Sequence, residues 1–125
     1  MPAREFRAEV RTIHNASMID LHGEVDAFAE QALLNQAYAE ATREKPATLI
    51  LNFADVDYIN SKGIALIVGV LAQARRAGIR LFVYGLSEHY QEIFKITRLA
   101  DFMTVFPDEA TALAQVAPQV STTGG

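Results

Sequence analysis

A serine with polar neighbours lies between a stretch typical of a strand and a pattern typical of a helix. The polar group is Asn60-Ser61-Lys62-Gly63, the strand pattern covers residues 48–53, and the apolar helical pattern begins at Ile64. At such a junction the first backbone N–H groups of the helix lack partners within the helix, which favours negative charge. Ser61 could therefore cap the helix, or it could accept a phosphate whose charge the helix end tolerates.

Patterns for other chemistries are missing or weak. Ser61 is not in the Gly-x-Ser-x-Gly context of a hydrolase nucleophile, and the sequence has no Gly-x-x-x-x-Gly-Lys-[Ser/Thr] phosphate loop. Asp55 and Asp57 could form a paired-carboxylate site, or they could simply face solvent. The histidines lie on separate predicted elements without metal-ligand spacing (His14, His22 and His89). We therefore expect no enzymatic activity, cofactor or metal, and interpret Ser61 as a substrate within a docking surface.

Composition indicates a single globular domain. The chain has 125 residues, of which 50% are hydrophobic, which is enough for a core and argues against disorder. Its net charge of −4 gives no electrostatic case for binding nucleic acid. It contains no cysteine, and no apolar run has the length of a signal peptide or membrane span. We expect a soluble, cytoplasmic protein with no membrane contact.

Periodicity predicts the order β-β-α-β-α-β-α-β-α. The first two strands should form a hairpin, and Asp26 is a candidate N-cap for the first helix. The prediction is a single α/β domain over residues 1–116, with a mixed sheet of about five strands and about four helices, followed by a flexible tail over 117–125. The exposed edge of the first strand could support a homodimer. The predicted strands cover residues 6–13, 18–23, 48–53, 79–84 and 102–106, and the predicted helices cover 27–44, 63–77, 88–96 and 108–116.

Four motifs in order resemble the STAS domain of bacterial anti-sigma factor antagonists. They are Leu21-His22-Gly23-Glu24-Val25-Asp26, the core motif from Leu51 through Ile64, the segment from Gly78 to Ser87, and Thr97-Arg98-Leu99-Ala100-Asp101-Phe102-Met103. The resemblance covers about residues 10–114. It implies the STAS fold, and a protein that binds an anti-sigma factor which is also a serine kinase. The kinase would use ATP to phosphorylate the antagonist and so release it, and a phosphatase would reset it.

The resemblance also assigns residues. Ser61 aligns with the phosphorylated serine and Gly63 with the glycine of the motif. Asn60 replaces the usual aspartate, and Lys62 replaces the usual second serine. Asp26 lies near the serine in the family fold, so it has either a capping role or an interface role. The implied site is therefore a phosphoacceptor at Ser61 within a partner-binding surface formed by Asp26, Asn60, Lys62 and Gly63.

The two departures leave the regulation open. Asn60 removes a negative charge beside the phosphoacceptor, whereas Lys62 adds a cation in the first helical turn, where a cation is mildly unfavourable. Lys62 could pair with an acidic partner, partly neutralise a phosphate, or point to solvent. Two further functions need no phosphorylation. One is the STAS subunit of a lipid-trafficking ABC transporter, and the other is a scaffold STAS protein of a stress-sensing assembly.

Overall fold

The computed structural model describes residues 4–13, 15–26 and 30–116. The start of the predicted first helix (27–29) and the predicted tail (117–125) lie outside the described residues. In chain order the elements are β1 (Arg7–Ile13), β2 (Ala16–Val25), α1 (Gln31–Ala41), β3 (Thr48–Ile59), α2 (Ser61–Arg76), β4 (Arg80–Tyr84), α3 (Glu88–Ile96), the 3-10 helix η2 (Leu99–Phe102), β5 (Thr104–Phe106) and α4 (Glu109–Ala114).

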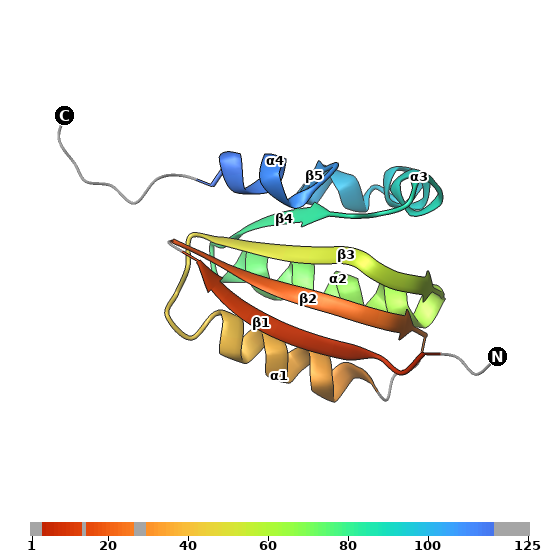
Figure 1. Ribbon diagram of the computed structural model, residues 1–125, viewed down its shortest axis with the longest axis horizontal. Coiled ribbons are helices and arrows are strands. Elements are labelled where there is room, and N and C mark those ends of the chain that lie inside the picture. Colours follow the sequence, from red (N-terminus) through yellow and green to blue (C-terminus); the bar gives the residue numbers. More distant parts are fainter. Residues whose placement is uncertain (1–3, 14, 27–29, 117–125) are drawn as a thin grey trace, which may run out of the picture.

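A five-stranded sheet forms the centre of the fold, in the spatial order β1-β2-β3-β4-β5. β1 and β2 form the predicted antiparallel hairpin, with Ile13 opposite Ala16, and the other three strand pairs are parallel. In Figure 1, α2 runs behind β2 and β3. The predicted α/β class, with a mixed sheet and about four helices, is confirmed. Within the described part of the chain, no helix has the length and hydrophobicity needed to cross a bilayer.

The two faces of the sheet are covered to different extents. Alternate strand residues, such as Leu49 and Leu51 of β3, join α1, α2 and α3 in the main core. Within that core Phe53 packs edge-on against Phe94 of α3, with the ring centroids 6.2 Å apart. The opposite face has a smaller apolar cluster that includes Ala112 of α4. Beyond this cluster β1, β2 and the second half of β3 carry charged side chains, so the strand that leads to Ser61 borders an open polar surface.

Several predicted boundaries are wrong. β3 has twelve residues and continues to Ile59, whereas the sequence predicted a strand ending at residue 53 and then a short turn. α1 begins at Gln31 with Glu30 in the N-cap position, so Asp26 does not cap it. The last strand starts at Thr104 because η2 occupies the preceding residues.

Candidate functional site

Ser61 is the first residue of α2 and is separated from the end of β3 by Asn60 alone. Its side chain is exposed, and no hydrogen bond to its hydroxyl is found among the residues that the structure describes. The hydroxyl is therefore accessible at a helix N-terminus, where backbone N–H groups and the helix dipole favour an added negative charge. The sequence placed Ser61 correctly at a strand-to-helix junction.

Asn60, and not Ser61, is the N-cap of α2. Its backbone is extended (φ −102°, ψ −171°), and its Oδ1 accepts a hydrogen bond from the N–H of Gly63 at 3.0 Å. Its Nδ2 donates to the carbonyl oxygen of Asp26 at 3.0 Å, and its backbone N–H donates to the carbonyl of Val25 at 3.3 Å. An aspartate could accept the first bond but could not donate the second. Asparagine in place of the family's aspartate thus keeps the N-cap and adds a hydrogen bond to the residue that follows β2.

Gly63 lets the first turn of α2 lie directly against the end of β2. A Cβ atom at this position would overlap the carbonyl oxygen of Val25 and would lie only 2.8 Å from its carbonyl carbon. The residue is buried, unlike its exposed neighbours Ser61 and Lys62. The glycine of the motif therefore has a packing role. The sequence alone did not indicate this role, because the resemblance placed Gly63 only in the partner-binding surface.

Carboxylates gather beside this junction. The backbone N–H of Asp26 donates to Oε1 of Glu30 at 3.0 Å. Partial burial raises the pKa of Glu24, and a hydrogen bond with Asp26 and the nearby charges of Asp26, Asp57 and Glu30 raise it further. A proton is held more tightly where negative charge is already concentrated. A phosphate added at this end of the molecule would therefore meet existing negative charge.

The structure brings the predicted partner-binding residues together. Asp26, at the end of β2, is joined to Asn60 by a hydrogen bond, and Lys62 and Gly63 follow in the first turn of α2. Sequence reasoning missed Tyr90 of α3, whose hydroxyl accepts a hydrogen bond from the N–H of Ile59 at 2.9 Å. This bond fixes the last residue of β3, and no local pattern predicts a contact across 31 residues.

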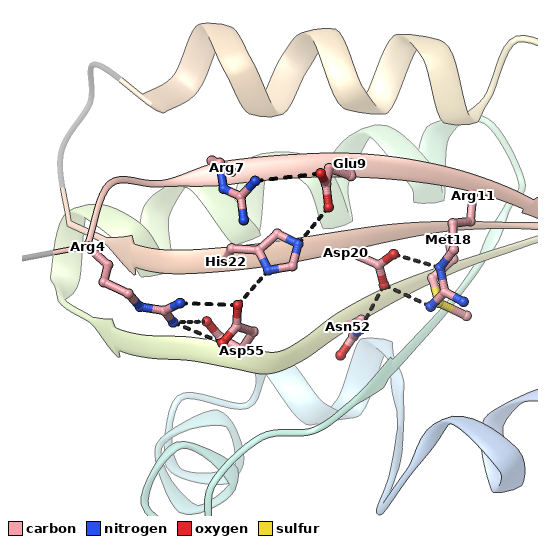
Figure 2. Close-up of polar contacts among 9 residues, drawn as sticks. All are labelled: Arg4, Arg7, Glu9, Arg11, Met18, Asp20, His22, Asn52 and Asp55. Atoms are coloured by element: carbon pink, nitrogen blue, oxygen red, sulfur yellow. Dashed lines mark hydrogen bonds and ion pairs between the residues drawn. The ribbon is translucent and has the colours of Figure 1, made fainter.

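A polar network covers the open sheet face next to the end of β3 (Figure 2). Nδ1 of His22 lies 2.6 Å from Oδ2 of Asp55, and its Nε2 lies 2.9 Å from Oε1 of Glu9, so the ring joins three strands. The Arg4 guanidinium binds the carboxylates of Asp55 and Asp57. Hydrogen bonds from Arg4 and His22 lower the pKa of Asp55 to about 2.

These ion pairs account for the two aspartates that the sequence left open. Asp55 and Asp57 share one arginine, so they are ion-pair partners that hold the N-terminal segment to β3. Further along the face, Arg11 binds Asp20 of β2 and Glu109 of α4. Within the described ranges, no group of three or more histidine, aspartate or glutamate side chains has a geometry suited to a metal ion.

Comparisons with known proteins agree with this architecture. The sequence profile of the STAS domain matches residues 7–112. The anti-sigma-B factor antagonist of Bacillus subtilis (strain 168) is 28% identical over 100 residues, which cover 80% of this chain and 90% of that protein.

Solved structures show the same fold. An anti-sigma factor antagonist from Mycobacterium paratuberculosis has a TM-score of 0.75 at 17% identity, covering 90% of this chain and 94% of that one. The Bacillus cell fate determinant SpoIIAA in its phosphorylated form has a TM-score of 0.64 at 22% identity, covering 90% and 100%. Together with the profile match over most of its length, these findings show that the chain belongs to the STAS domain family.

Proposed function

We propose that this chain is a cytoplasmic anti-sigma factor antagonist whose binding is switched by phosphorylation of Ser61. In its unmodified form it binds an anti-sigma factor that is also a serine kinase, and a phosphatase removes the phosphate. The docking surface is formed by Asp26, Asn60 and Lys62, positioned by Gly63. The observation that carries the proposal is the exposed hydroxyl of Ser61 at the start of α2, to which no described residue forms a hydrogen bond. Curated relatives named anti-sigma-B factor antagonist support it.

Electrostatics explains how such a switch would work. A phosphate adds a charge of roughly −1.5 to −2, which the N-terminus of α2 can tolerate in the free protein. In a packed interface the same charge must be paired or lose its water, which is costly. The carboxylates of Glu24, Asp26 and Asp57 would add repulsion. Lys62 would offset part of this charge, so the net penalty depends on what the partner presents.

Mass spectrometry tests the proposal directly. The purified chain is incubated with ATP and a candidate anti-sigma kinase, and the mass of the intact protein is measured. We expect one added phosphate, which Ser61→Ala abolishes because the acceptor oxygen is gone. Ser87→Ala is the matched control, since Ser87 is also an exposed serine at the start of a helix. That variant should still gain the phosphate.

Other outcomes would contradict the switch. Phosphorylation of Ser61 is contradicted if no mass is added, or if the added mass persists in Ser61→Ala. The transporter-subunit and scaffold functions both predict no added mass. The chain acts in this proposal as a substrate and a docking surface, and the kinase supplies the chemistry.

A homodimer through β1 stays a prediction. β1 is an edge strand, and antiparallel pairing with a second copy centred on Ala8 would place Arg7 of each chain opposite Glu9 of the other. Opposite charges facing each other across strands are favourable. Sedimentation equilibrium should then show a dimer that Arg7→Glu weakens and Arg43→Glu, on an exposed turn after α1, does not. A monomer at all concentrations would exclude this pairing.

A further inference from the structure

A hollow of about 470 Å³ lies at the end of α2 opposite Ser61. Its lining includes Arg75 from the last turn of α2, Arg80 and Phe82 from β4, and Phe102 from η2. Arg75 lies fourteen residues after Ser61 in α2, so at 1.5 Å per residue the hollow is about 21 Å along the helix from Ser61. The volume is in the range of small-molecule sites in proteins, and the hollow is separate from the docking surface proposed above.

Aromatic rings support the two arginines of this hollow. The Cζ atom of Arg75 lies 4.6 Å from the ring centroid of Phe102, and that of Arg80 lies 5.3 Å from the centroid of Phe82. Phe82 is itself buried and packs against Phe106, with the ring centroids 4.9 Å apart. A guanidinium stacked on a ring loses part of its rotamer freedom before any ligand arrives, which lowers the entropic cost of binding.

The same two arginines differ from Arg4 and Arg11 in their charge partners. Arg4 and Arg11 each bind two carboxylates. In the described part of the chain neither Arg75 nor Arg80 forms an ion pair. The nearby carboxylate of Asp101, which also lines the hollow, is bound by Arg98 at 2.6 Å. The hollow is therefore locally positive in a chain whose net charge is −4.

We propose that this hollow binds a small organic anion through a phosphate or carboxylate group held by Arg75 and Arg80. The planar guanidinium presents paired N–H donors that match the oxygens of these groups. The hollow is open to solvent, and its volume fits a compact ligand better than an extended acidic peptide. The exposed ring of Phe102, 48% of whose surface is accessible, offers apolar contact to the remainder of the ligand.

The proposal is tested by titrating the isotopically labelled full chain with inorganic pyrophosphate and, separately, with citrate, at constant ionic strength. We expect saturable shifts in amide NMR signals concentrated in η2, β5 and the start of β4. Arg75→Gln and Arg80→Gln should each weaken binding by about tenfold or more, because each removes one charge-assisted contact. Pyrophosphate binding tighter than citrate would assign the site to phosphates, and the reverse order to carboxylates.

Matched variants decide whether the effect belongs to the hollow. Arg43→Gln removes an exposed arginine that does not line it, and should leave binding unchanged. Arg75→Lys keeps the charge but loses the planar fork, and should bind with intermediate affinity. The proposal is overturned if neither anion gives saturable shifts up to about 10 mM, which corresponds to about 2.7 kcal/mol. It is also overturned if the double variant Arg75→Gln/Arg80→Gln still binds, or if a polyglutamate peptide binds more tightly than either anion.

Discussion

Gly63→Ala is expected to lower the free energy of unfolding by about 3 kcal/mol or more, whereas Gly69→Ala should leave it unchanged or raise it by up to about 1 kcal/mol. Both glycines lie in α2, so the loss of helix-destabilising glycine is common to the two variants. They differ in their surroundings. A Cβ at residue 63 would overlap the backbone of Val25, while a Cβ at residue 69 would meet nothing within 4 Å.

The overlap at Gly63 cannot be relieved by a change of rotamer, because the obstructing atoms belong to a backbone carbonyl. Either α2 must move away from β2, or the end of β2 must move. Each movement disturbs the hydrogen bonds that Asn60 donates to the carbonyl oxygens of Asp26 and Val25. Urea unfolding of the two variants beside the parent chain measures the difference. Equal stabilities of the two variants would show that the first turn of α2 is not held against β2 as described.

Ser61→Asp is expected to weaken binding to the anti-sigma partner by more than about a hundredfold, a difference of about 3 kcal/mol, with little change in the melting temperature. This expectation rests on the proposed function. A carboxylate at the first residue of α2 is favoured by the helix dipole, so the free protein should not lose stability. In the complex the same charge would have to be buried or paired beside the carboxylates of Asp26 and Glu24.

The control for this variant is Ser61→Asn, which has nearly the same shape as the aspartate but no charge. Isothermal titration with the purified partner should give Ser61→Asn an affinity close to that of the parent chain. If both variants lose affinity equally, size rather than charge is responsible and the electrostatic switch is wrong. If Ser61→Asp melts far below the parent, the hydroxyl instead has a structural role in the first turn.

The order of strands and helices could be predicted because the spacing of apolar residues within each segment indicates its secondary structure. Residues 48–53 are a nearly continuous apolar run, and α3 was predicted with the bounds 88–96 that the structure shows. The second half of β3 could not be predicted in this way. Its residues Asp55, Asp57 and Tyr58 are typical of a polar turn. In the structure the two aspartates contact Arg4 and His22, which are distant in sequence, and Tyr58 pairs with Glu24 of β2.

The N-cap of α2 was predicted to within one residue. Both Asn60 and Ser61 are good capping residues, so composition alone could not choose between them. Asn60 takes the cap because its amide also reaches Asp26 at the end of β2, a contact that depends on strand pairing. Similarly, the sequence could not show that Arg98 adopts a left-handed backbone (φ 68°) before η2. This residue accounts for the late start of β5.

The close seating of α2 on β2 also limits what a modification of Ser61 can convey. Gly63 packs against the backbone of Val25, and Asn60 donates a hydrogen bond to Asp26. These contacts hold the start of α2 in place, so a group added to Ser61 is not expected to move the helix. A partner would therefore meet two forms that share one backbone conformation and differ in their surface potential around Ser61. The electrostatic effect of the added charge is screened beyond about 10 Å at 0.1 M salt. A partner would therefore detect the modification only through groups that lie close to Ser61.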